Sequence, residues 1–174
     1  MKILLIAVLV TASAVAQDKP LALPSACGPK HVSFDVKLAD APQSVTQPDP
    51  VKATVFFIED NGPMGNHQQY TIKIGLDGAW VGAYQHNAYF AVSVEPGEHH
   101  ICAKVQSRFL AGHNLALLHF EAVAGKVYFF WTQFLAGLTT MYPSAPFLEL
   151  NRLDSDQANY LISTFPRSVS QPKQ

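Results

Sequence analysis

This chain is poor in charge. Only 14% of its residues are charged, the formal net charge is −1, and no run of lysine or arginine occurs. A nucleic-acid-binding surface needs concentrated positive charge to displace counterions, so the composition argues against a nucleic-acid partner. Hydrophobic residues make up 48% of the chain, which is typical of a globular protein rather than a disordered one.

The chain also lacks an apolar run long enough to span a bilayer. Its longest apolar stretch follows Lys2 and ends in Ala14-Val15-Ala16. A positive start, a short apolar core and a small-x-small end are the features of a secretory signal peptide, and they predict cleavage before Gln17. The alternative is a buried N-terminal helix. We expect residues 1–16 to be removed and the mature chain to be exported to the periplasm or the extracellular space, without a transmembrane segment.

Cysteine is scarce, with Cys27 and Cys102 as the two copies. An even number of cysteines in an exported chain favours a disulfide between them. Two alternatives stay open, a lipid-modified Cys27 and a pair of free buried thiols. Pro24 stands where a lipoprotein signal carries an aliphatic residue, which argues against the lipid anchor.

The sequence has no G-x-S-x-G, no H-E-x-x-H and no glycine-rich phosphate loop. Its seven histidines do not form a ligand pattern: His99 and His100 are adjacent, so a strand points them to opposite faces. A zinc site needs at least three converging ligands. We predict no catalytic residue, no metal and no cofactor, and keep as the alternative an exported metal-dependent binder or hydrolase that uses His99, His100 and His113.

Most of the chain reads as short strands separated by turns. Residues 31–38 alternate between apolar and polar side chains, which predicts a half-buried strand. Residues 51–58 are almost all apolar, which predicts a central strand covered on both faces. The predicted turns are at Asp77-Gly78, Pro96-Gly97 and Gly125, where glycine tolerates a positive φ.

Near the C-terminus the period changes to that of a helix. Asp154 is a suitable N-cap, and Pro166 ends the segment. The apolar stripe consists of Ala158, Leu161, Ile162 and Phe165.

These patterns predict a mostly-β protein, an antiparallel β-sandwich or flattened barrel of about seven to eight strands with one C-terminal α-helix. The single domain would cover residues 31–166, after an extended segment at 17–30 and before a flexible tail at 167–174. A helix-led α/β fold is the alternative, but too few segments carry the helical period.

Polar loops and aromatic side chains near the first hairpin are the candidates for a binding surface. The loops are residues 61–67 and 83–87, and the candidate side chains are Trp80, Tyr84, His86 and Asn87. Aromatic residues also fill sandwich cores, so core packing is the competing interpretation.

Four elements in order carry a family resemblance: D-G-x-x-V-G within 76–82, Y-F within 87–90, V-x-P-G-x-H at 94–99 and G-K-x-Y-F within 124–129. This order resembles the bacterial domain of unknown function 2846 family, and the motifs are similar to PEGA-type β modules of cell-envelope proteins. The resemblance implies an exported β-rich domain, often on lipoproteins, with no established activity. The chain differs by lacking a lipid-attachment signal and by adding Cys27, Cys102 and the C-terminal helix.

The expected function is therefore that of a non-catalytic envelope or secreted module. It would bind or scaffold an envelope protein or a glycan.

Overall fold

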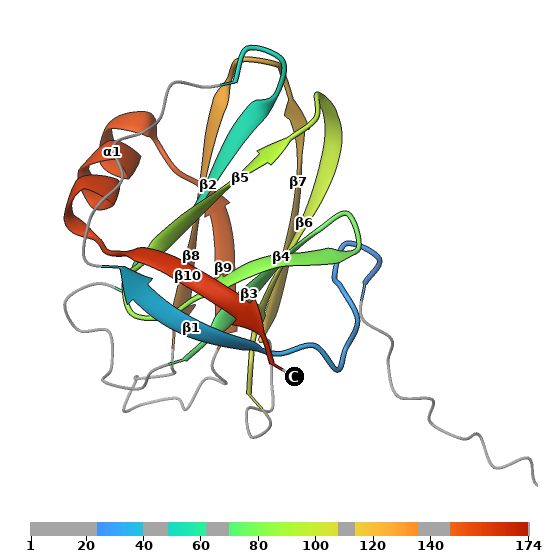
Figure 1. Cartoon of the computed structure of the whole chain (residues 1–174), viewed down its shortest axis with the longest axis vertical. Helices are drawn as coiled ribbons and strands as arrows, with labels where there is room; N and C mark the ends of the chain where they lie inside the picture. The colour runs from blue at the N-terminus through green and yellow to red at the C-terminus, as the bar shows by residue number, and fades with distance from the viewer. Residues whose placement is uncertain (1–23, 40–48, 62–69, 108–113, 136–146, 174) are drawn as a thin grey trace, which may run out of the picture.

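The computed structural model describes residues 24–39, 49–61, 70–107, 114–135 and 147–173. These residues form ten strands and one helix (Figure 1). The strands are β1 (Phe34–Ala39), β2 (Ala53–Glu59), β3 (Ile72–Leu76), β4 (Ala79–Tyr84), β5 (Tyr89–Val94), β6 (Gly97–Val105), β7 (Leu115–Ala122), β8 (Val127–Leu135), β9 (Phe147–Arg152) and β10 (Arg167–Pro172), and the helix is α1 (Ser155–Thr164).

Two sheets make up the protein, which confirms the predicted mostly-β sandwich with a C-terminal helix. One sheet has the order β1-β10-β5-β2-β8-β9, and the other has the order β4-β3-β6-β7. The described residues form ten strands, more than the seven to eight expected, and the sequence analysis did not expect β10. Two pairs, β2 with β8 and β10 with β5, are parallel rather than antiparallel. Alternation along one strand carries no information on the direction of its neighbour, so these pairs could not be read from the pattern.

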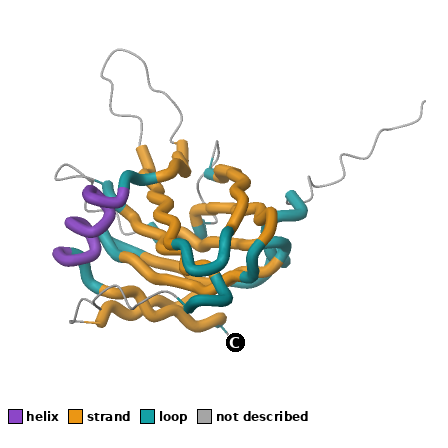
Figure 2. Tube along the Cα trace, turned by 90° about the horizontal axis from the view of Figure 1, so that it is seen from above, coloured by secondary structure: helices purple, strands orange, loops and turns teal. Residues whose placement is uncertain are grey.

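β2 explains how the layers are held together. Val55 and Phe57 point into the core between the sheets, whereas Phe56 and Ile58 belong to a second apolar cluster beneath the helix. Both faces of the strand are therefore covered, as its continuous apolar run predicts. Figure 2 shows the helix at one side of the stacked strands.

The helix begins and ends where the sequence places it. The Asp154 carboxylate accepts hydrogen bonds from the backbone N–H groups of Asp156 and Gln157, which satisfies two donors of the first turn. The predicted stripe supplies the buried residues Ala158, Leu161 and Ile162. The C-cap is Phe165, directly before Pro166.

The segment after the helix corrects the sequence analysis. Residues 167–172 are not a flexible tail but strand β10, which lies between β1 and β5. Six residue pairs from Phe34↔Pro172 to Ala39↔Arg167 join it to β1. The segment is polar and short, so it carries little hydrophobic signal. It is held by backbone hydrogen bonds and by Ser168, whose hydroxyl donates to the Ala83 carbonyl at 2.7 Å.

The predicted turns adopt the expected backbone conformations. Asp77 and Gly78 have φ values of 50° and 89° and form the two-residue connection between β3 and β4. Gly97 has φ 133° directly after Pro96, and Gly125 has φ 72° between β7 and β8.

Candidate functional site

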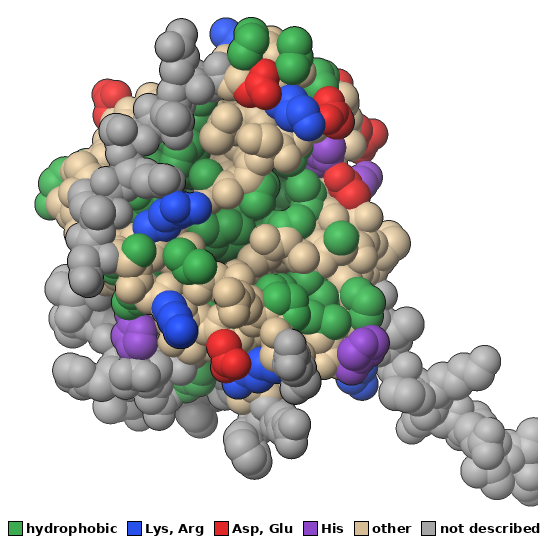
Figure 3. Space-filling model, in the orientation of Figure 1, with side chains coloured by type: hydrophobic (Ala, Val, Ile, Leu, Met, Phe, Trp, Pro, Cys, Tyr) green, Lys and Arg blue, Asp and Glu red, His purple; other side chains and the backbone are tan. Residues whose placement is uncertain are grey.

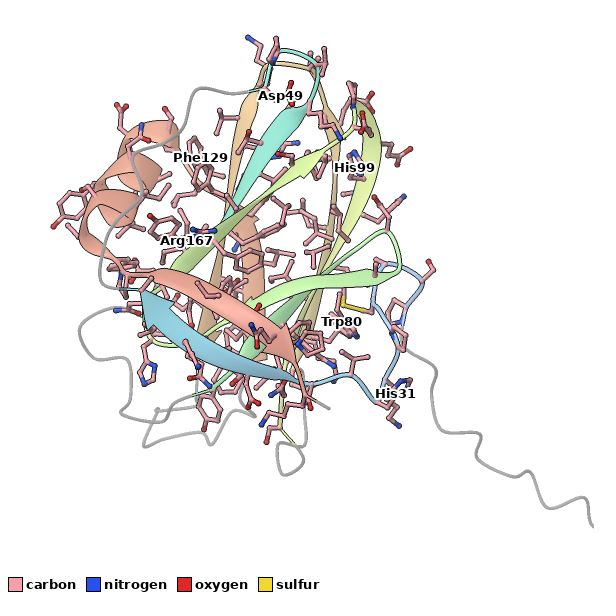
Figure 4. The ribbon with its side chains drawn as sticks, viewed as in Figure 1. His31, Asp49, Trp80, His99, Phe129 and Arg167 are labelled. Atoms are coloured by element: carbon pink, nitrogen blue, oxygen red, sulfur yellow. A yellow bond between two sulfur atoms is a disulfide. The ribbon has the colours of Figure 1, made fainter. Side chains whose placement is uncertain are left out.

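Residues 24–33, which we call the N-terminal segment, lie against the four-stranded sheet. The predicted disulfide between Cys27 and Cys102 is present and fastens this segment to β6. The Trp80 indole N–H donates to the Pro29 carbonyl at 2.8 Å, and the Gly78 N–H donates to the Ala26 carbonyl at 3.2 Å. Figure 4 shows the disulfide beside Trp80 and His31 further along the same segment.

The close approach of this segment depends on a glycine in β3. A Cβ atom at Gly75 would lie 2.9 Å from the Ala26 carbonyl oxygen and 3.2 Å from the Cys27 Cα. Backbone atoms cannot give way as a flexible side chain can, so a larger residue at this position would push the segment off the sheet.

The N-terminal segment forms one wall of a groove, which we call the lysine groove. Its volume is about 940 Å³. It contains no acidic side chain, and its lining residues are Lys30, His31, Val32, Ser33, Lys73, Lys104, Val105, Gln106, Ser107 and Lys173. The four lysines come from four separate segments: the N-terminal segment, β3, β6 and the end of the chain.

Two of these lysines face each other across neighbouring strands. Lys73 of β3 is the register partner of Lys104 of β6. Like charges directly opposite one another destabilise a sheet, whereas opposite charges stabilise it. Lys73, Lys104 and Lys30 have no carboxylate partner among the described residues. The groove therefore holds positive charge that the described part of the protein does not neutralise.

The environment of Lys73 makes this charge unusual. Its side chain is only 3% exposed. Its ammonium donates to the Val32 carbonyl at 2.5 Å and lies 4.0 Å from the centroid of the Trp80 ring. Burial, and then the nearby charge of Lys104, lowers the pKa of Lys73 to about 8.

Lys104 and Lys173 complete the groove in different ways. The Lys104 ammonium donates to the Asn114 side-chain oxygen at 3.1 Å. Burial, and then the charge of Lys30, lowers the pKa of Lys104. Lys173 instead forms an ion pair with Asp35 at 3.0 Å, and both side chains are largely exposed. The unneutralised charge is therefore centred on Lys73, Lys104 and Lys30.

The predicted aromatic surface is not one site. Tyr84 is fully buried, because its hydroxyl pairs with the Thr132 hydroxyl at 2.8 Å inside the sandwich. The prediction that Tyr84 belongs to a binding surface was wrong, and the competing interpretation, packing in the core, is correct. Trp80 is half-buried under Lys73 at the other end of β4. His86 is exposed and Asn87 is half-buried, both with positive φ in the loop after β4.

That loop meets the start of the other predicted loop. The Asn61 N–H donates to the Asn87 side-chain oxygen at 2.9 Å, and the Asn61 side-chain oxygen accepts from the Phe134 N–H at 3.0 Å. The rest of the first loop, residues 62–67, lies outside the described residues.

Glu59 lies buried beside this network, at 1% exposure. One carboxylate oxygen accepts from the Asn61 amide at 2.7 Å, and the other, Oε2, has no hydrogen-bond partner. Burial raises the pKa of Glu59 to about 7, although the bond from Asn61 works in the opposite direction. The ionised form is thus poorly solvated in the folded protein.

We predict that Glu59→Gln is more stable than the wild type at pH 8. An unfolded glutamate titrates near its ordinary value of 4.5, whereas the folded pKa is about 7. The folded state holds a proton that the unfolded state has lost in this window, so wild-type stability falls as pH rises from 4.5 to about 7. The wild type loses about 3 kcal/mol of unfolding free energy over this pH interval. Glu59→Gln avoids this loss, although the unpaired side-chain amide of glutamine cancels part of the gain.

Urea unfolding at pH 5 and pH 8 checks this expectation. The exposed Glu98→Gln is the matched control and should keep the wild-type pH dependence. Equal pH dependence in Glu59→Gln and wild type would contradict the raised pKa.

The histidines do not assemble a metal site in the described part of the chain, where no group of three His, Cys, Asp or Glu side chains is suitably placed. His99 Nδ1 lies 2.6 Å from an Asp77 carboxylate oxygen, and Nε2 lies 2.7 Å from the Glu95 carbonyl oxygen. Both neighbours are acceptors, so only the doubly protonated ring satisfies both. His100 is exposed, and His113 lies outside the described residues.

The surroundings of His99 favour its charged form. Burial works against the imidazolium, but the hydrogen bond and charge of Asp77 outweigh it, and the pKa of His99 is raised. His99 therefore links the β3–β4 turn to the β5–β6 turn and is not a free base. Figure 4 places His99 at the upper right. Figure 3 shows acidic and histidine side chains together in that region of the surface.

Sequence reasoning missed the lysine groove. Its only signal was a lysine within each of two apolar strands, in Ile72-Lys73-Ile74 and Ala103-Lys104-Val105.

No protein-family model, curated protein or solved structure matches the chain. The resemblance to the domain of unknown function 2846 family remains a prediction, as does the signal peptide, since residues 1–16 lie outside the described residues. No helix within the described ranges is long and apolar enough to cross a membrane.

Proposed function

We propose that this protein is an exported, non-catalytic binding module that captures an anionic ligand in the lysine groove. The observation that carries the proposal is the cross-strand pair Lys73 and Lys104, which has no carboxylate beside it. Lys30 adds a third amine close enough to lower the pKa of Lys104. Such a cluster is costly in the free protein, and a bound anion would remove the cost.

The form of the groove supports binding rather than catalysis. Lysine ammonium groups act as point charges for carboxylate, phosphate or sulfate. The lining includes Ser33, Ser107 and His31, but it contains no carboxylate that could orient the histidine as a general base. Its one wall is fixed by a disulfide, so its shape exists before the ligand arrives.

The disulfide and the signal-like N-terminus support export to the periplasm or the extracellular space. The ligand would then be an anionic component of the cell envelope or the medium. The family resemblance of the first hairpins is consistent with this location.

We predict that sulfate binds wild-type protein and that Lys104→Glu weakens the binding. The substituted carboxylate faces Lys73 and occupies the position of the anion, so affinity falls about tenfold or more. The same change pairs Lys73 across the strands, so the variant should melt at least as high as the wild type. Isothermal titration calorimetry measures the first effect, and a thermal melt measures the second.

The matched control is Lys126→Glu, which makes the same charge change at an exposed position in the β7–β8 turn. It should bind sulfate as the wild type does. If the two variants lose affinity equally, the effect belongs to net charge and the lysine groove is not the site.

We also predict that sulfate affinity falls between pH 7 and pH 9. The pKa of Lys73 is about 8, so its ammonium loses its charge over this interval while sulfate stays doubly charged. In Lys73→Arg the guanidinium keeps its charge, so the affinity should change little over the same interval. Circular dichroism confirms that the variant is folded. A wild-type affinity that is constant from pH 7 to pH 9 would show that Lys73 takes no part.

A further inference from the structure

Given that the groove binds anions, we infer that its natural ligand is a chain with several anionic groups, namely an acidic polysaccharide. The inference starts from the distribution of the charge. Lys73 and Lys104 form a pair, Lys30 comes from the N-terminal segment, and Lys173 adds an exposed amine from the end of the chain. Amines from four separate segments suit a ligand that carries several negative charges.

The size of the groove also favours a ligand that is larger than a single small anion. Its volume of about 940 Å³ lies near the upper end of the range of about 300–1,000 Å³ for small-molecule sites. Sulfate or phosphate would fill only a small part of this space. The groove is therefore large enough for several linked units, with room for charges spaced along the ligand.

The strands behind the groove disfavour a peptide ligand. β3 and β6 are interior strands of the four-stranded sheet, so neither offers a free edge for an added peptide strand. The apolar lining consists of Val32 and Val105, which form no pocket for a large anchor residue.

The lining also disfavours a nucleic acid. Single-stranded nucleic acids bind by stacking their bases on aromatic side chains. The groove presents no Phe, Tyr or Trp, because the nearby Trp80 ring is covered by the Lys73 ammonium.

Fixed neutral polar groups favour a sugar. The Gln106 amide is held by two hydrogen bonds to the backbone of Phe34, at 2.7 and 2.9 Å, and Ser33 adds a hydroxyl. Lysines interspersed with hydroxyl and amide groups match a ligand that alternates carboxylate or sulfate groups with hydroxyl groups.

The test compares galacturonic acid with its trimer and hexamer by calorimetry, using the whole mature chain at several salt concentrations. The hexamer should bind about tenfold or more tightly than the monomer. The plot of log affinity against log salt should have a slope of about −1 for the monomer and about −2 to −3 for the hexamer. Lys30→Gln should reduce the hexamer slope by about 1.

Two competitors complete the experiment. Poly-glutamate and single-stranded DNA of the same charge should bind more weakly than the hexamer, and the methyl-esterified hexamer should not bind. Equal affinity for poly-glutamate or for DNA, or a hexamer no tighter than the monomer, would overturn the polysaccharide while sulfate binding stands. Failure of sulfate and of every uronate would instead refute the anion-binding function itself.

Discussion

Truncation after Pro166 is expected to abolish the cooperative fold. The deletion removes β10, and β10 lies between β1 and β5 in the six-stranded sheet. β1 would lose its only partner strand among the described residues, together with the six register pairs that join the two. The sandwich would also lose the bonds by which Ser168 and Ser170 hold the backbone of Ala83 in the other sheet.

Each lost backbone hydrogen bond contributes about 0.5–1.5 kcal/mol, so their sum approaches the total stability of about 5–15 kcal/mol for a small domain. Near-ultraviolet circular dichroism and urea unfolding measure the result. The matched control ends the chain after Pro172, which keeps β10 and removes Lys173 and Gln174. It should fold normally. A wild-type unfolding midpoint for the 1–166 chain would mean that the last residues are the flexible tail expected from their polarity.

Removal of the disulfide has the second large expected effect. The double substitution of Cys27 and Cys102 by serine should lower the free energy of unfolding by about 2–5 kcal/mol. The bridged residues are 75 positions apart, and in the chain-entropy account a loop of that size contributes about 4 kcal/mol. Urea unfolding of the double variant measures the loss.

The same change should weaken sulfate binding about tenfold, because the disulfide holds the wall that carries Lys30 and the carbonyl partner of Lys73. Reduction of the wild type should reproduce both effects, and reductant should leave the double variant unchanged. If the reduced wild type keeps its stability, the bridge does not contribute as the structure implies. If only the affinity stays constant, the wall is held by the Trp80 and Gly78 hydrogen bonds instead.

Local patterns predicted the elements whose causes are local. The α1 helix follows from a capping aspartate and an apolar stripe, which act within one or two turns. The β3–β4 hairpin follows from Asp77-Gly78, because few other residue pairs accept two positive φ values in succession. The covered position of β2 follows from its unbroken apolar run.

The groove could not be predicted, because its cause is not local. Lys73 and Lys104 become neighbours only through the pairing of β3 with β6, two strands that are not consecutive in the chain. A single lysine in an apolar strand is typical of an edge strand, or of the solvent-facing side of a strand that alternates apolar and polar residues. Only the register shows that two such lysines meet, and only the folded position of the N-terminal segment brings Lys30 near Lys104.

Tyr84 and β10 were misjudged for a related reason. A tyrosine near a hairpin can be either exposed or buried. The hydrogen bond between Tyr84 and Thr132 of the other sheet shows that this one is buried. β10 has few apolar side chains, so its stability comes from neighbours on both sides rather than from its own composition.

The place of β10 also sets the order of events in biosynthesis. The first described strand, β1, pairs with the last described strand, β10. About a hundred and thirty residues separate the two, and a ribosome adds about 5–20 residues each second. The β1 edge of the six-stranded sheet therefore cannot form until residues 167–172 have been made. Until β10 is made, β1 lacks its partner strand, so this edge of the sheet is the last part of the described fold to be completed.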